Sequence, residues 1–180
     1  MKNATVARNY AEALLAAAEA RGEAELFGHL LDAVAGAVQA DARIALALES
    51  PRVPKAKKTQ VLEDALAGAA PAEFVRFLQA VVRRGRQGLL SDIAREYLGL
   101  VDLKLNRVHA AVTLLKDPDP ALRKQIVDRL AEALGKDVRA LFRADAGILG
   151  GVVVRVGDRI FDGSVRRRIQ VLRRKMLGVE

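Results

Sequence analysis

The stretch DAGILGGVVVRVGDRIFDGSV, residues 145–165, decides the fold of the C-terminal part of the chain. It contains two short apolar runs whose residues alternate like those of β-strands, and the turn-forming pair Gly157-Asp158 separates the runs. Asp162-Gly163-Ser164 then precedes a basic amphipathic segment, as expected at the start of a helix. The pattern predicts a β-hairpin that runs into a helix, a structural unit with no obvious catalytic groups.

The segment that precedes this hairpin has the sequence pattern of a strand, a helix and a second strand. Val108, Ala110, Val112 and Leu114 alternate with other residues in the manner of a strand, and residues 138–144 are expected to form a second strand. Between them, Asp119 is placed to cap a helix, Pro120 occupies its first position, and Gly135 follows its last apolar residue. The predicted order is β-α-β-β-β-α, so we expect a small α+β domain over residues 106–180.

The N-terminal part of the chain reads as a series of helices separated by short breaks. Glycine and proline mark most of the breaks, and Ser91 is placed to cap the last helix. The expected helices cover about residues 4–21, 23–40, 41–48, 54–68, 71–84 and 91–105. Because the links are short, we expect a mostly α protein, in which an N-terminal six-helix bundle over residues 1–105 is followed by the α+β domain.

Composition excludes several classes of protein. Of the 180 residues, 51% are hydrophobic, which is enough for a packed core, and the absence of cysteine excludes a disulfide scaffold. No apolar run approaches the roughly 18 residues that a membrane span needs, so we expect no direct membrane insertion. The net charge of +8 is uneven, because residues 106–180 carry 16 basic and 9 acidic side chains. This basic C-terminal part should meet an acidic surface.

Neither a phosphate site nor a metal site is indicated. Gly147, Gly150 and Gly151 lack the lysine and hydroxyl pair of a phosphate loop, so a close approach of two backbone segments is the favoured reading. His29 and His109 lie far apart in the sequence and have no other ligand residue at metal-binding spacing. We therefore expect no catalytic residue, no metal and no cofactor.

Two of the predicted helices carry more apolar surface than one core requires. Tyr10, Ala13 and Leu14 belong to one stripe of the first helix, while Ala7, Ala11, Leu15 and Ala18 form a second stripe. The fifth helix likewise has one stripe that contains Phe77 and Val81, and another with Val75 and Val82. The surplus fits a groove for an amphipathic helix of another protein, and equally fits two helices at the centre of the bundle.

The last predicted helix combines an apolar stripe with a cluster of cations. Val165, Ile169 and Leu172 share one face, which we expect to pack inward on the hairpin. Six basic residues surround the stripe, among them Arg166, Arg167, Arg173 and Arg174. Such a face is commonly only solvated, but it would also suit nucleic acid or an acidic partner helix. The helix has no aromatic residue on which bases could stack.

Three motifs in the chain resemble one known family, the delta subunit of F-type ATP synthases, called the oligomycin-sensitivity-conferring protein in mitochondria. Ala7-Arg8-x-Tyr10-Ala11-x-Ala13-Leu14 resembles the opening helix of that family. Phe77-Leu78 through Arg84-Gly85-Arg86, with Leu90, Ile93 and Tyr97, resembles its fifth and sixth helices. The most specific match is to its C-terminal signature, at Asp145, Leu149, Gly150, Gly151, Val154, Val156, Gly157, Asp162, Ser164 and Val165.

The resemblance implies a non-catalytic stator subunit at the cytoplasmic face of the bacterial plasma membrane, present in one copy per complex. It implies that the N-terminal domain binds the N-terminal helix of an alpha subunit, for which we expect Tyr10, Ala13, Leu14, Phe77 and Val81 to form the site. It also implies that the C-terminal domain binds the end of the b-type peripheral stalk, for which we expect Arg166, Arg167, Arg173 and Arg174 to attract an acidic stretch. The alternative function is a basic nucleic-acid-binding module.

Overall fold

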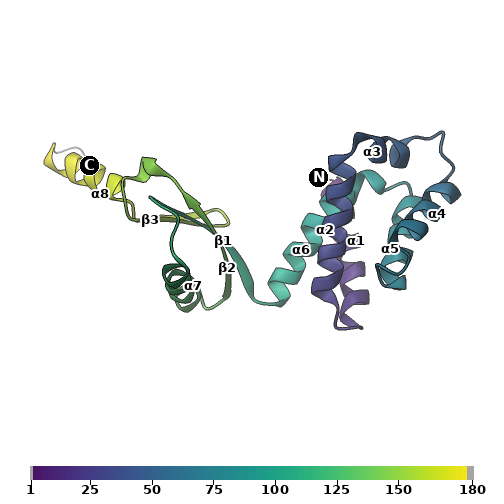
Figure 1. The fold of residues 1–180 in the computed structure, drawn as a ribbon, viewed down its shortest axis with the longest axis horizontal. Helices are drawn as coiled ribbons and strands as arrows, with labels where there is room; N and C mark the ends of the chain where they lie inside the picture. Colours follow the sequence, from purple (N-terminus) through teal and green to yellow (C-terminus); the bar gives the residue numbers. More distant parts are fainter. Residues whose placement is uncertain (1, 178–180) are drawn as a thin grey trace. The chain divides into compact units, whose positions relative to one another are not determined.

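The computed structural model describes residues 2–177, and the chain divides into two compact units between Asp102 and Leu103 (Figure 1). The first unit is helical, and the second contains a four-stranded sheet with helices. This arrangement confirms the predicted fold class, a helical N-terminal part with six helices followed by an α+β part.

The helices of the first unit begin and end close to the predicted breaks. Gly22 follows the first helix in a left-handed conformation, and the Asp41 side chain caps the third helix by accepting a hydrogen bond from the Arg43 backbone N–H. Pro54 and Pro71 precede the fourth and fifth helices. The six helices are α1 (Lys2–Glu19), α2 (Ala24–Ala40), α3 (Ala42–Glu49), α4 (Lys55–Leu66), α5 (Ala72–Arg83) and α6 (Leu90–Lys104).

The predicted cap of the sixth helix is wrong. A short 3₁₀ helix, η1 (Gln87–Leu89), runs directly into α6, so Ser91 lies inside the helix instead of before it. The Ser91 hydroxyl accepts a hydrogen bond of 2.9 Å from the Gln39 side-chain amide. This hydrogen bond connects α6 to α2. The helix needs no serine cap at this position, because the preceding 3₁₀ turn already forms its start.

The core of the first unit is formed by α1, α2, α5 and α6. The rings of Phe27 and Phe74 meet edge to face with centroids 5.6 Å apart, and both side chains are fully buried. Tyr97 is also fully buried, and its hydroxyl donates a 2.9 Å hydrogen bond to the Ala24 carbonyl. Burial raises the pKa of Tyr97, with a smaller contribution from Glu19. These contacts join α6 and α5 to α2.

The second unit is a mixed four-stranded sheet in the order β2-β1-β3-β4. The central strand β1 pairs parallel with β2 and antiparallel with β3, and β3 forms a hairpin with β4. The helix α7 connects the parallel pair, as a parallel connection requires. The elements are β1 (Arg107–Leu114), α7 (Pro120–Leu134), β2 (Asp137–Ala144), η2 (Ala146–Ile148), β3 (Val152–Val156), β4 (Arg159–Asp162) and α8 (Val165–Met176).

The boundaries and packing of α7 follow from its sequence. The Asp119 carboxylate accepts a 2.7 Å hydrogen bond from the Leu122 backbone N–H, and Gly135 ends the helix in a left-handed conformation, as predicted. The apolar residues of α7 pack on one face of the sheet, where the buried strand residues are Ala110, Val112, Val138 and Val154. This small cluster is the core of the second unit.

The glycine pair before β3 has the structural role favoured from the sequence. Gly151 has a φ of +82°, and a Cβ atom there would lie 2.6 Å from the Gly163 carbonyl oxygen. The segment before β3 therefore touches the segment that leads into α8. The Val165 backbone N–H also donates to the Gly150 carbonyl, so the start of α8 is tied to this glycine pair.

Candidate partner-binding surfaces

An aromatic pair joins α1 and α5 at the edge of the helical core. The rings of Tyr10 and Phe77 lie edge to face with centroids 6.3 Å apart, and both side chains are half-buried. Ala13, one turn along α1 from Tyr10, is exposed. Val6 and Ala17 continue the same side of α1 and are also partly exposed. We call these five residues the α1–α5 surface.

Two of the residues expected in the groove lie elsewhere. Leu14 is 1% exposed and Val81 is 0% exposed, and both belong to the helical core. They lie behind Tyr10 and Phe77 and do not reach the surface in this structure. The second stripe of α1 and Val82 of α5 are buried as well, so central packing accounts for most of the apolar residues of both helices. The surplus that reaches solvent comprises the α1–α5 surface and the partly exposed Val75 of α5.

The last helix, α8, does not pack as expected. Val165, Ile169 and Leu172 were expected to pack inward on the hairpin, but Ile169 is 54% exposed and Leu172 is 59% exposed. Val165 and Met176 are exposed too, so the whole apolar stripe is uncovered. The start of the helix is held by the Gly150 contact and by the Ser164 hydroxyl, which accepts a hydrogen bond from the Arg167 backbone N–H.

The four arginines expected to bind the stalk are all exposed on α8. Arg166 donates a 3.4 Å hydrogen bond to the Gly147 carbonyl, and Arg167 lies 4.0 Å from the Asp162 carboxylate. Hydrogen bonds from Ser164 lower the pKa of Asp162, with a further contribution from Arg167. Arg173 and Arg174 lie in the last turns of the helix. By helical spacing, Arg166 and Arg173 flank the uncovered apolar stripe, whereas Arg167 and Arg174 lie on the opposite side of the helix.

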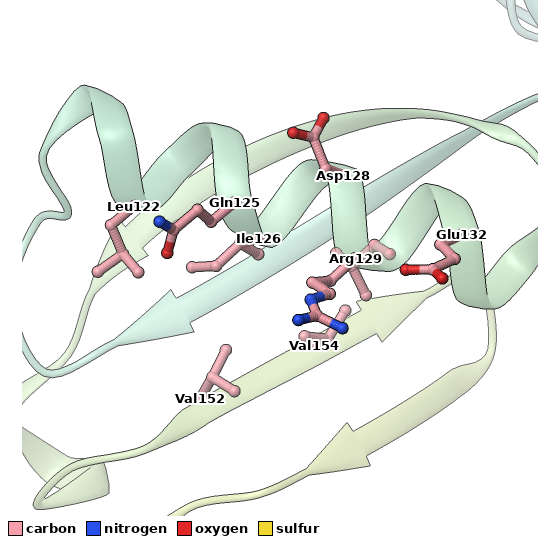
Figure 2. Close-up of a pocket in the computed structure, with 9 residues that line it drawn as sticks. Leu122, Gln125, Ile126, Asp128, Arg129, Glu132, Val152 and Val154 are labelled. Carbon is pink, nitrogen blue, oxygen red and sulfur yellow. The ribbon is translucent and has the colours of Figure 1, made fainter.

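The structure contains a cavity on the sheet that the sequence pattern did not predict. It lies between α7 and β3 and has a volume of about 670 Å³. Figure 2 shows Val152 and Val154 on its β3 side facing Leu122 and Ile126 of α7. Phe161 of β4 is opposite Val154 in the strand register and is 51% exposed. The alternating residues of β3 include Val152 and Val154, which line the cavity. The sequence pattern alone does not show which part of the sheet α7 leaves uncovered.

Neither a cluster of metal ligands nor a membrane-spanning helix is found among the described residues. No group of three or more His, Asp or Glu side chains among residues 2–177 is placed to hold a metal ion, and His29 and His109 are exposed. No helix in the described part of the chain is long and apolar enough to cross a membrane. What the geometry offers is a set of apolar surfaces with charged margins, which suits binding of other proteins.

Comparison with known proteins gives a single answer. Residues 6–176 match the family described as the ATP synthase delta (OSCP) subunit. The chain belongs to this family. It is 47% identical to ATP synthase subunit delta of Gemmatimonas aurantiaca over 97% of this chain and 94% of the relative. It is 36% identical to ATP synthase subunit delta of Chlorobium phaeovibrioides over 100% of this chain and 99% of the relative.

A solved structure supports the fold independently. The chain matches a chain in the cryo-EM structure of the Toxoplasma gondii mitochondrial ATP synthase hexamer with a TM-score of 0.65. The match covers 95% of this chain and 97% of that chain at 20% sequence identity, so it concerns the fold. With the family established, the chain is a non-catalytic delta/OSCP subunit, a stator component of the F-type ATP synthase peripheral stalk. It is part of a membrane-associated complex that serves ATP synthesis and proton transport.

Proposed function

We propose that this chain links the alpha/beta hexamer of the ATP synthase to the b-type peripheral stalk. The helical unit binds the N-terminal helix of an alpha subunit, and the C-terminal unit binds the C-terminal end of the stalk subunit. One copy acts in each complex, at the cytoplasmic face of the bacterial plasma membrane. Because the hexamer is then held against the torque of the central shaft, rotation drives conformational change in the catalytic subunits.

The α1–α5 surface supports the first contact. Val6, Tyr10, Ala13 and Ala17 recur at spacings of three and four residues, which is the pattern that one helix presents to another. Phe77 adds a second wall from α5, and the small side chain of Ala13 leaves room for an approaching helix. Leu14 and Val81 contribute from behind, because their packing fixes the positions of α1 and α5.

The observation that carries the proposal is the uncovered apolar stripe of α8. The helix has 12 residues, and a helix this short is marginal in water without tertiary packing. Its exposed Val165, Ile169, Leu172 and Met176 would be covered by a partner helix. Arg166, Arg167, Arg173 and Arg174 on the same helix favour an acidic stretch of the stalk subunit, although each exposed pair contributes only about 0–1 kcal/mol.

Two titrations of the full chain test the two contacts separately. For the first, an alpha-subunit N-terminal peptide is titrated, and Ala13→Glu should weaken its binding. Ala16→Glu serves as the matched control, because Ala16 is exposed on the Glu12 side of α1. Absence of binding by the wild-type chain would refute the alpha contact.

For the second contact, a C-terminal fragment of the stalk subunit is titrated at several salt concentrations. Reversing Arg166, Arg167, Arg173 and Arg174 to Glu should slow association and remove its salt dependence. The quadruple Arg→Lys variant keeps the charge, so it should retain the association rate and the salt dependence of the wild type. Ile169→Asp should also weaken binding, with the neighbouring Gln170→Asp as control. Unchanged affinity in the Arg→Glu variant would mean that the basic face is only solvated, and tight salt-dependent binding of duplex DNA instead would favour the nucleic-acid alternative.

A further inference from the structure

A second apolar groove lies on the helical unit, away from the α1–α5 surface. It has a volume of about 930 Å³ and shares no residue with that surface. Its walls come from α2, α3, α4 and the loop between α3 and α4. We call it the α2–α4 groove, and its apolar lining includes Leu30, Val34, Val38, Ile44, Ala47, Leu48, Val53, Val61, Leu62, Ala65 and Leu66.

The lining is more apolar than a solvated surface requires. Leu30, Val34 and Val38 follow one another at intervals of four along α2 and pass from the edge of the core to the open groove. On the other walls, Ile44 is 41% exposed and Val61 is 57% exposed. Large aliphatic side chains gathered in a concave surface usually mark a binding site.

The margin of the groove is positively charged. Its lining contains four cations, Arg43, Arg52, Lys57 and Lys58, and a single acid, Asp41. Asp41 is already neutralised, because Arg43 pairs with it at 2.9 Å. Lys58 is buried and donates a 2.8 Å hydrogen bond to the Ser50 carbonyl, which holds the α3–α4 loop in place. The exposed Arg52 and Lys57 remain at the rim, so the groove favours an occupant with negative charge beside an apolar face.

The length of the groove suits a short helix. Its α2 wall extends from Leu30 to Val38 and its α4 wall from Lys57 to Leu66, which correspond to roughly 12–14 Å at about 1.5 Å per residue. A helix of two to three turns has this length. We propose that the α2–α4 groove binds an acidic amphipathic helix from another protein chain. This site is separate from the alpha-subunit contact and does not depend on it.

The test uses the full chain and two fluorescein-labelled 16-residue peptides. Both peptides carry the same leucines on one helical face, and the remaining positions are Glu and Gln in one peptide and Lys and Gln in the other. Fluorescence anisotropy should show the acidic peptide binding at least tenfold more tightly than the basic peptide. Equal affinity for both peptides, or no binding of the acidic one, would overturn the proposal.

Neighbouring residues of α3 provide matched variants. Ile44 lines the groove, whereas Leu46 is 74% exposed and does not. Ile44→Asp should weaken the acidic peptide at least tenfold, and Leu46→Asp should change its affinity less than twofold. The double variant Arg52→Glu, Lys57→Glu should abolish the preference for the acidic peptide. Equal loss in both α3 variants, or retention of the preference in the double variant, would contradict the assignment.

Methyl NMR locates the bound peptide independently of these variants. Shifts on addition of the acidic peptide should be confined to groove residues such as Val34, Val61 and Leu62. Ala13→Glu should leave both the shifts and the affinity unchanged, which separates this site from the alpha-subunit contact. Shifts at Val6 or Ala17 instead would overturn the proposal. Laurate, a fatty acid, is added in a separate titration, and shifts of the groove residues with laurate but not with the peptide would also overturn it.

Discussion

Ala13 and Leu14 are adjacent in α1 but have opposite environments, and this difference yields the sharpest prediction for the helical unit. Leu14 is 1% exposed within the core, so Leu14→Ala should lower the free energy of unfolding by roughly 2–5 kcal/mol. For a unit of about 100 residues, each kcal/mol lowers the melting temperature by about 4–8 °C. The variant should therefore melt at least about 8 °C below the wild type.

Ala13→Glu should behave in the opposite way. The side chain enters solvent on an exposed helix position, so the stability should change by less than about 0.5 kcal/mol. Binding of the alpha N-terminal peptide should nevertheless be weakened. Circular dichroism melts at 222 nm and peptide titrations of the two variants, each in the full chain, measure both quantities. A normal melt for Leu14→Ala, or unfolding by Ala13→Glu, would refute the division of α1 into a buried and a binding face.

Three further predictions concern single positions. Gly151→Ala should destabilise the second unit by more than the roughly 1–2 kcal/mol of left-handed strain, because the added Cβ would lie 2.6 Å from the Gly163 carbonyl oxygen. Urea denaturation should show a smaller loss of stability for Gly157→Ala, where an added Cβ would have nothing within 4 Å. Tyr97→Phe should cost about 0.5–1.5 kcal/mol in the same assay by removing the hydrogen bond to Ala24, and an unchanged midpoint would contradict that role. Leu172→Ala should change stability by less than about 0.5 kcal/mol, since this side chain is 59% exposed, and a larger loss would mean that α8 packs on its own domain.

Local sequence signals predicted most of the elements because backbone chemistry determines them locally. Asp119 and Pro120 start α7, Gly135 ends it, and Gly157 marks the turn between β3 and β4. Ser91 was the exception. A serine next to a loop fits a helix cap, but in the structure a 3₁₀ turn precedes α6 and the Ser91 hydroxyl accepts a hydrogen bond from Gln39, a tertiary contact that the local pattern does not contain.

The candidate surfaces were harder to predict, because periodicity identifies an apolar face without saying what covers it. The stripe of α8 was correctly seen as apolar, yet Leu172 lies in solvent and not on the hairpin. Periodicity does not rank the two stripes of α1. The structure buries the second stripe, and it divides the first, with Leu14 in the core and Tyr10 at its edge. The α2–α4 groove joins Val34, Ile44 and Val61 from three helices, and no local window of sequence contains that juxtaposition.

The central claim is that one chain holds two partners at once, through separate surfaces on its two units. Native mass spectrometry of the full chain mixed with the alpha N-terminal peptide and the stalk C-terminal fragment measures this directly. We expect a 1:1:1 complex, from which Ala13→Glu removes only the peptide and Ile169→Asp removes only the fragment. Mutually exclusive binding of the two partners, or loss of both partners in either variant, would contradict it.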